Sequence, residues 1–446
     1  MTPGPFDLLV RGGLVVMPQG ISRRDVAVQG EKIAAVEVDL PPDSARQVVD
    51  ATGKFVLPGV VDVHTHPLYE DDFQWTAITA AWGGTTTLVH YAYAFPGMTV
   101  PEAIEHAIAE GSRASCLDFA LHVGLFQVER QYQEIPEAFR LGVRTFKMFM
   151  TYAKLGRMTS DYYLAAAMDL IAAHGGMAMI HAENGLATDY LEDKFNRLGV
   201  PAIQAFGRMR PAVLEAEAIH RAIAIAQVCG CPVYFPHVSA GLCLEPIRRA
   251  QAAGLPVYAE TCPQYLTLTE EDLFRWGPLA KIAPPLRTAA DNEALWQGIR
   301  DGTIQVVASD HAPKAKTRET DFFEAAYGSP QAETLLTVTY DAGVNGGKIT
   351  LPRLVEVLCE APARLLGLYP RKGSLEPGAD ADLVLFDPSQ MHVLRGETQH
   401  SRAGYTLYEG RTCLGKPWMT FQRGRPVLVD GELVARPGDG RYLRLV

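Results

Sequence analysis

The sequence predicts an α/β protein: a TIM-like (β/α)8 barrel joined to a small β-sandwich domain that the N- and C-terminal segments build together. Two observations predict this fold. Through the middle of the chain, eight apolar, β-rich runs alternate with helical patterns. Eight β/α units in about 300 residues fit a barrel with insertions. Both ends of the chain have a different sequence pattern, which predicts short strands separated by turns.

The two β-rich ends share this pattern of short strands and turns. The first fifty residues contain FDLLVRGGLVVM, DVAVQGEKIAAVEVDL and QVVDATGKFVL, and the C-terminal part contains DADLVLFDP and MTFQRGRPVLVDGELV. Because a long middle of another pattern separates them, we expect the two ends to meet in one domain. The predicted sandwich domain is 1–52 with 376–446, and the predicted barrel domain is 53–375.

The barrel strands are predicted from continuous hydrophobicity, which is typical of strands covered on both faces. A doubly wound open sheet is the alternative, but no glycine-rich dinucleotide fingerprint follows an early strand. Long connections after the fifth and eighth runs, at 184–210 and 312–334, are typical of functional loops. The predicted strands are 60–66, 85–93, 118–126, 145–150, 177–183, 232–239, 256–262 and 304–313.

Composition excludes several classes of partner. The formal net charge is -10 with both signs interspersed, which argues against nucleic acid. The longest apolar stretches have strand length, so no membrane span is expected. The first residues lack a basic region followed by an apolar one, so no signal peptide is predicted. The seven scattered cysteines are expected to be reduced, in a cytoplasmic protein.

A pair of histidines gives the first chemical signal. His64 and His66 lie two residues apart on the first predicted strand, so both side chains point to the same face. They lie at the C-terminal end of that strand, where barrel active sites assemble. Asp62 precedes them. This pattern favours a divalent metal site over two unrelated core histidines.

Other strands also carry polar residues near their C-terminal ends. Each of these residues, taken singly, fits a buried polar side chain satisfied by the backbone. Closure of a barrel would bring all of them around one mouth. Imidazoles with a carboxylate suit zinc, manganese or iron, and six such side chains suffice for two ions. Beside His64 and His66, the residues are Lys147, His181, His237 and Asp310.

Lys147 does not fit the simple metal site. It lies in TFKMFM, among residues that predict a fully buried strand. Lysine is almost never fully buried without a partner, and an ammonium has no lone pair for a metal. The lysine must therefore be neutral, paired with a carboxylate or chemically converted, and the residue pattern leaves these three alternatives open.

The other histidines have simpler explanations. His122, in the middle of a strand, is predicted to be a hydrogen-bonded core residue. His90 and His311 lie close enough to the predicted ligands to orient them through hydrogen bonds. Solvated helical or surface positions account for the rest, which are His106, His174, His220, His392 and His400.

Five motifs follow one another in a characteristic order: H-T-H at 64–66, F-K-M-F-M at 146–150, H-A-E-N-G at 181–185, H-V-S at 237–239 and S-D-H at 309–311. This ordered set resembles the cyclic amidohydrolases of the amidohydrolase superfamily, and most closely the dihydropyrimidinase and D-hydantoinase family. The likeness covers nearly the whole chain. Further motifs support it: ALHVGLF at 120–126, AETCPQYLTL at 259–268, PPLR at 284–287 and GLYPRKGSLEPGADADLV at 367–384.

The resemblance implies a barrel with two divalent metal ions, usually zinc. His64, His66 and Asp310 would hold the more buried ion, and His181 and His237 the other. Lys147 would be carbamylated by carbon dioxide and would bridge both ions. A carbamate between two cations removes the problem of a stranded ammonium. Relatives of this kind are commonly homo-oligomers, so a tetramer or dimer is expected.

The resemblance also implies a reaction on a small cyclic amide, a hydantoin or a dihydropyrimidine. A hydroxide bridging the metals would attack a ring carbonyl. Asp310 would take the proton and return it to the leaving nitrogen, and the hydroxyl of Tyr152 would stabilise the oxyanion. A non-catalytic assembly protein with this fold characteristically lacks metal ligands, and all six are present here.

Two sequence differences bear on the substrate. Ala283 stands where a serine often precedes PPLR, which keeps allantoinase as an alternative. Dihydroorotases follow their H-x-H with Leu-Arg, whereas Pro67 and Leu68 stand here, so a carboxylated ring is disfavoured. We expect Ala283 and Tyr152 to contact the ring. The residues expected to line an apolar pocket for a ring substituent are Leu68, Tyr69, Phe95 and Tyr152.

Overall fold

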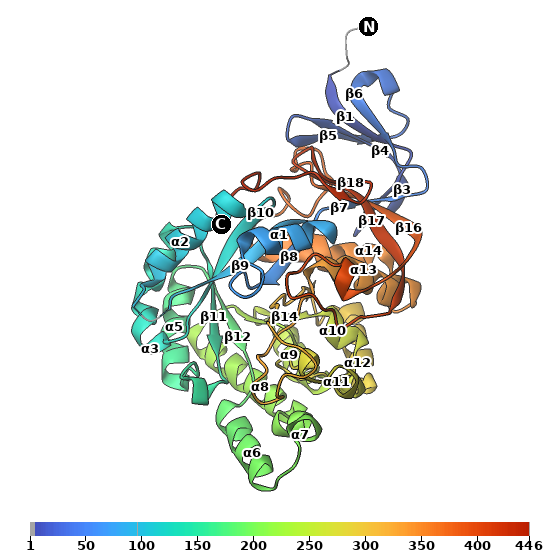
Figure 1. Cartoon of the computed structure of the whole chain (residues 1–446). Helices are drawn as coiled ribbons and strands as arrows, with labels where there is room; N and C mark the ends of the chain where they lie inside the picture. The colour runs from blue at the N-terminus through green and yellow to red at the C-terminus, as the bar shows by residue number, and fades with distance from the viewer. Residues whose placement is uncertain (1–4, 96, 446) are drawn as a thin grey trace.

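The computed structural model describes residues 5–95 and 97–445 and has two parts, a parallel barrel and a β-sandwich (Figure 1). The predicted fold class is therefore confirmed. Within the described residues, no helix is both long and apolar enough to cross a membrane. The barrel strands are β8 (Val60–Thr65), β9 (Thr85–Tyr93), β10 (Asp118–Gly124), β11 (Thr145–Phe149), β12 (Met177–His181), β13 (Val233–Phe235), β14 (Val257–Thr261) and β15 (Val306–Val307).

The barrel closes through an irregular last strand. Strands β8 to β15 pair in chain order. The expected strand 304–313 is regular only at Val306–Val307, because the backbone turns at Asp310, where φ is 51°. The chain then returns to β8 at His311: its amide N lies 3.2 Å from the carbonyl of His64, and its carbonyl accepts from His66 N at 2.9 Å. This bridge joins the two histidine positions to the last strand.

Helices surround the barrel (Figure 1), and some of them begin or end at recognisable caps. In α2, Thr99 and Glu102 form a reciprocal capping box, and α8 ends at Gly230 in the left-handed region. The helices are α1 (Phe73–Trp82), α2 (Val100–Ala114), α3 (Val128–Gln131), α4 (Ile135–Arg140), α5 (Asp161–Ala173), α6 (Gly185–Arg197), α7 (Ala202–Met209), α8 (Ala212–Cys229), α9 (Leu244–Ala252), α10 (Pro263–Thr267), α11 (Glu270–Trp276), α12 (Ala289–Asp301), α13 (Leu335–Thr339), α14 (Leu351–Val355) and α15 (Ala361–Leu365).

The sandwich brings the two ends of the chain together, as the blue and red strands show (Figure 1). One sheet is N-terminal: β1 (Phe6–Arg11), β4 (Asp25–Gln29), β5 (Lys32–Glu37) and β6 (Ala45–Asp50). The other mixes both ends: β2 (Leu14–Met17), β3 (Gly20–Arg23), β7 (Phe55–Pro58), β16 (Leu383–Val393), β17 (Thr412–Gln422), β18 (Arg425–Val429) and β19 (Glu432–Leu433). Strand β7, which lies beyond 1–52, pairs antiparallel with β16. Side chains such as Val10, Val26, Val56 and Phe421 fill the space between the sheets.

The last described residues leave the sandwich and close the barrel at the N-terminal ends of its strands. Leu443 N donates to the carbonyl of Phe119 at 2.7 Å, and Leu445 N donates to that of Gly142 at 2.9 Å. Both leucines are buried against Val61 and other residues of the barrel interior. The barrel is therefore plugged at the N-terminal ends of its strands, and its open mouth is at the opposite ends.

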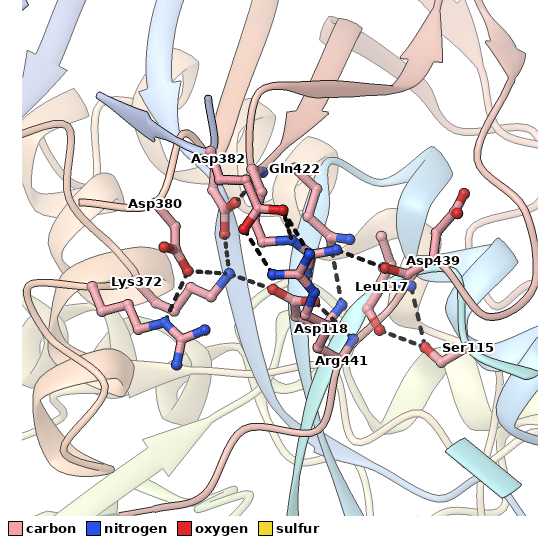
Figure 2. A network of polar contacts seen from close by, with 12 residues as sticks. Ser115, Leu117, Asp118, Lys372, Asp380, Asp382, Gln422, Asp439 and Arg441 are labelled. Carbon is pink, nitrogen blue, oxygen red and sulfur yellow. Dashed lines mark hydrogen bonds and ion pairs between the residues drawn. The ribbon is translucent and has the colours of Figure 1, made fainter. Parts of the chain in front are cut away.

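A buried ionic cluster joins the barrel to the sandwich (Figure 2). Lys372 Nζ lies 2.6 Å from Asp118, at the start of β10, 2.8 Å from Asp382 and 3.1 Å from Asp380. The Arg423 guanidinium pairs with Asp118 from the sandwich side. Burial lowers the pKa of Lys372, but Asp382 and the other carboxylates outweigh it and raise the pKa above its usual value. The lysine therefore stays charged and holds the carboxylates together.

Removing this lysine is expected to weaken the junction. Lys372→Met leaves the buried aspartates without their cation, which typically costs about 3–5 kcal/mol. The urea midpoint of unfolding should fall markedly. Lys348→Met is the matched control, because Lys348 pairs with Glu293 at the surface, where ion pairs contribute little. Equal midpoints for the two variants would contradict a stabilising role for the cluster.

Candidate metal centre

The six predicted ligand residues converge at the mouth of the barrel. Lys147 Nζ lies 3.0 Å from His64 Nε2. Asp310 Oδ1 lies 3.2 Å from His64 Nε2 and 3.3 Å from His66 Nε2. The ring centroid of His237 is 4.5 Å from that of His181 and 5.4 Å from that of His64. The structure therefore brings together residues that the chain separates by up to 246 positions, from 64 to 310.

Backbone strain marks three residues at this mouth. Tyr152, His237 and Asp310 have positive φ values of 67°, 45° and 51°. Residues other than glycine rarely adopt this conformation, and where they do, it is often at functional sites. Each of the three follows a barrel strand, so the turn takes the side chain out of the strand's alternating pattern.

Hydrogen bonds fix the orientation of His64. Its Nδ1–H donates to Glu260 Oε1 at 2.6 Å. Glu260 in turn accepts from the Tyr234 hydroxyl at 2.6 Å and from His237 N at 3.1 Å. With Nδ1 occupied, Nε2 of His64 presents its lone pair toward Lys147 and Asp310. A carboxylate behind a histidine is the usual support of a metal ligand.

The rings of His66 and His181 are fixed in the same way. Nδ1 of His66 is hydrogen-bonded to the Tyr93 hydroxyl at 2.9 Å, which leaves Nε2 toward Asp310. Nε2–H of His181 donates to Glu183 Oε2 at 2.7 Å, which leaves Nδ1 as the acceptor nitrogen. Glu183 is itself held by the buried Arg210, whose Nε donates at 3.0 Å. Each imidazole therefore keeps one nitrogen available as a ligand.

Burial sets the charge of the site. It lowers the pKa of His64, His66 and His237 well below the usual value, so the imidazoles are neutral. It also lowers the pKa of Lys147 to about 8. Neutral imidazoles and a carboxylate form a donor set that fits a divalent transition metal. Ligand atoms of His64, His66 and Asp310 all lie within 4.8 Å of one another, which suits a shared ion.

Comparison with known proteins identifies the family. The sequence profile described as the amidohydrolase family matches residues 55–427. The chain belongs to the amidohydrolase family. It is 38% identical to the D-hydantoinase of Streptomyces coelicolor, over 97% of each chain. The resemblance to the D-hydantoinase and dihydropyrimidinase group is therefore confirmed.

Solved structures agree with this assignment. One, titled D-hydantoinase, is 35% identical and covers 98% of this chain and 99% of its own, with a TM-score of 0.93. The L-hydantoinase (dihydropyrimidinase) from Arthrobacter aurescens is 34% identical and also has a TM-score of 0.93, with coverage of 98% and 100%. Amidohydrolases are metal-dependent, and the His64, His66 and Asp310 group accords with that.

Above the ligand residues, this amidohydrolase has a cavity of about 510 Å³. Tyr152 and Ala283, expected to contact substrate, line it, and so does Tyr69. Leu68 and Phe95 are not among the lining residues. Leu68 packs into the barrel interior, and Phe95 is 45% exposed, with its ring centroid 6.3 Å from that of Phe126.

The remaining histidines near the ligands of this amidohydrolase contact backbone and neighbouring side chains. His122 Nε2–H donates to the carbonyl of Val63 at 2.9 Å, as a core residue. His90 Nδ1 lies 2.8 Å from Oγ1 of Thr65, the residue between His64 and His66. His311 Nε2–H donates to Asp71 at 2.9 Å. His400, expected on a solvated face, instead stacks on Trp82 with ring centroids 3.9 Å apart.

Three residues that hold the ligand side chains in place were not predicted from the sequence: Glu260, Glu183 and Arg210. Glu260 is the only charged residue in the predicted strand 256–262, which was a usable signal. Glu183 lies two residues after His181, so its side chain points to the same face. Arg210 carried no local signal. It lies at the end of the connection 184–210, which contains α6 and α7.

Proposed function

We propose that this amidohydrolase hydrolyses a ring C–N bond of a cyclic amide, a 5-substituted hydantoin or a dihydropyrimidine. The observation that carries the proposal is the convergence of six ligand side chains at the barrel mouth, directly beneath a cavity of about 510 Å³. The matching relatives are named hydantoinases and dihydropyrimidinase, which favours these rings over allantoin or dihydroorotate.

The centre would hold two divalent ions, which we take to be zinc. His64, His66 and Asp310 would ligate one, and His181 through Nδ1 and His237 the other, with a carbamate on Lys147 between them. The orientation of His64 and His181 supports this division. Within the described residues, Lys147 Nζ has no carboxylate at ion-pair distance. Such ions, when bound, lower the pKa of a bound water to about 7 and polarise the substrate carbonyl.

Asp310 is placed to move the proton. Its Oδ1 lies within 3.3 Å of Nε2 of His66 and 3.2 Å of Nε2 of His64, on the side that faces the cavity. The carboxylate would accept the proton of the attacking water and deliver it to the leaving ring nitrogen. The turn at φ 51° points the side chain toward this position.

Tyr152 is placed to stabilise the oxyanion. Its ring centroid lies 5.2 Å from that of His181, and it lines the cavity. Burial raises the pKa of its hydroxyl above the usual value, so it remains a hydrogen-bond donor. A fixed donor in a water-poor cavity stabilises a developing oxyanion more strongly than it would in water.

Tyr152→Phe is expected to lower kcat by about 10²–10³ while metal content is unchanged, because a single oxyanion donor is lost. Steady-state kinetics with metal analysis would measure both. Tyr327→Phe is the control, since its hydroxyl lies in the same cavity but not beside His181. A kcat for Tyr152→Phe equal to that of the control would remove the tyrosine from the reaction.

The substrate class is tested with a panel of cyclic amides. Purified, metal-loaded protein is assayed for ring opening of dihydrouracil, hydantoin, 5-phenylhydantoin, allantoin and dihydroorotate. We expect turnover of hydantoins or dihydrouracil and little of the last two. A preference for allantoin would overturn the substrate assignment. A protein that neither binds metal nor opens any ring would overturn the hydrolase itself.

We also propose a homo-oligomer in the cytoplasm. All seven cysteines are free thiols, which suits a reducing compartment. Helix α6 carries the exposed apolar side chains Leu186 and Tyr190, 65% and 59% exposed, which suit burial against a second copy. Sedimentation analysis should show a dimer or tetramer, and a monomer at all concentrations would contradict the proposal.

A further inference from the structure

An aromatic wall leads from the metal residues toward the opening of the cavity. The Tyr93 hydroxyl is bonded to His66, and the ring of Phe126 stacks on Tyr93 with centroids 4.6 Å apart. The centroid of Tyr69 lies 6.2 Å from that of His66. Tyr69, Tyr93 and Phe126 all line the cavity. A ring substituent that leaves the metal site on this side would run along them.

Two cations lie on this wall. The Arg157 guanidinium is 4.4 Å from the centroid of Phe126, and Lys314 Nζ lies over the ring of Tyr69. Both line the cavity. They come from different loops: Arg157 follows β11, and Lys314 follows β15 in the long connection 312–334.

Within the described part of the chain, neither cation forms an ion pair. Over residues 5–95 and 97–445, no side-chain ion pair involves Arg157 or Lys314. Lys154, which lines the same cavity, differs: it pairs with Glu192 at 2.9 Å and Asp193 at 2.7 Å. Two like charges on a half-buried apolar wall are unfavourable unless an anion lies between them.

The rings under the two cations belong to one aromatic row: Tyr69 neighbours His66, and Phe126 stacks on Tyr93, whose hydroxyl is bonded to His66. Burial and the charge of Arg157 together lower the pKa of Lys314 to about 7, against the opposing effect of Asp310. The carboxylate that acts on Lys314 is Asp310, whose oxygen already faces His64 and His66. The permanently charged guanidinium of Arg157 therefore supplies positive charge at this place, a nearby anion would also favour the charged form of Lys314, and the described residues leave that anion to a ligand.

We propose that Arg157 and Lys314 form an anion subsite that binds a carboxylate on the exocyclic substituent of the substrate. The inference rests on the proposed function and specifies its substrate: a hydantoin or dihydropyrimidine whose substituent ends in a carboxylate. Water adds across a ring amide bond, the carbonyl carbon becomes a carboxylate, and the nitrogen stays in the ureido product. The exocyclic carboxylate does not react and only anchors the ring.

The position of the subsite sets the length of the substituent. The segment after His66, with Pro67 and Leu68, offers no cation to a carboxylate attached directly to the ring. Arg157 is separated from His66 by the rings of Phe126 and Tyr93, and Lys314 by that of Tyr69. A carboxylate on a short alkyl spacer fits this arrangement, and the ring acid dihydroorotate does not.

An isosteric pair of substrates tests the subsite: 5-(2-carboxyethyl)hydantoin and 5-(2-carbamoylethyl)hydantoin, which differ in charge but hardly in size. We expect kcat/KM to be at least about tenfold higher for the carboxylate, since charge-assisted hydrogen bonds are the stronger ones. Arg157→Met and Lys314→Met should each reduce this ratio. Lys154→Met, the control, should leave it unchanged because Lys154 is already paired.

The outcomes separate the subsite from the hydrolase. Calorimetric binding of the same two compounds to the metal-loaded Asp310→Asn variant, in which turnover is expected to be slow, measures the charge preference apart from ring opening. Tighter binding of the carboxylate that is lost in Arg157→Met supports the subsite even if no ring is opened. If hydantoin or dihydrouracil is opened but the carboxamide is used and bound as well as the carboxylate, the subsite is wrong and the proposed function stands. Unchanged ratios in both variants would also overturn it.

Discussion

Lys147→Ala is expected to yield a protein without its metal pair and with kcat/KM reduced at least about a thousandfold. Loss of a residue that only supports a ligand typically costs about 10–100-fold in metal affinity or activity. A residue that ligates both ions should cost more, because its loss separates them and removes the negative charge between them. Nζ of Lys147 lies 3.0 Å from His64 Nε2, inside the ligand set. Elemental analysis and steady-state kinetics measure the two effects.

Lys154→Ala is the control for this experiment, because Lys154 lines the same cavity but is paired with Glu192 and Asp193. It should keep two metals per chain. Intact mass spectrometry under non-denaturing conditions should also show one added CO₂ on the wild-type chain and none on Lys147→Ala. Two metals per chain in Lys147→Ala would rule out the bridging role.

Asp310→Asn is expected to reduce kcat by about 10²–10⁴ even at saturating metal, because the amide cannot accept the proton that a general base takes. Asparagine keeps the size of the side chain and tolerates the left-handed backbone at φ 51°. The fold should therefore persist, and metal affinity should also fall because the carboxylate beside His64 and His66 is lost.

The control is Asp189→Asn. Asp189 lines the same cavity and accepts a hydrogen bond from Lys154 N at 3.2 Å, away from the ligand set. Titration with zinc, followed by kcat at saturation, separates affinity from turnover. An Asp310→Asn enzyme that turns over at the wild-type rate once saturated would show that another group moves the proton.

Much of the barrel was predictable because its signals are local. Continuous apolar runs gave each barrel strand, and the even spacing of His64 and His66 placed both side chains on one face. The convergence of Lys147 with these histidines also follows once a barrel is assumed, because all eight strands run in parallel and end at the same mouth.

The parts that could not be predicted depend on contacts between distant residues. Asp310 itself was predicted as a ligand, but the turn that carries it past the two-residue strand β15 was not, because no local pattern indicates it. Phe95, expected to line a pocket, is 45% exposed, because loop direction and not residue type decides which aromatics face the cavity. Arg157 and Lys314 share no motif, so only the fold shows that both cations lie on one wall.

Folding of the sandwich must wait until most of the chain has been synthesised. Its N-terminal sheet ends at Asp50, yet the side chains that cover it include Leu375, Leu383 and Phe421. At typical translation rates of about 5–20 residues per second, the apolar face that includes Val10 and Val26 waits roughly 16–65 s for its partner. The barrel segment therefore emerges from the ribosome before the N-terminal sheet can bury its apolar face.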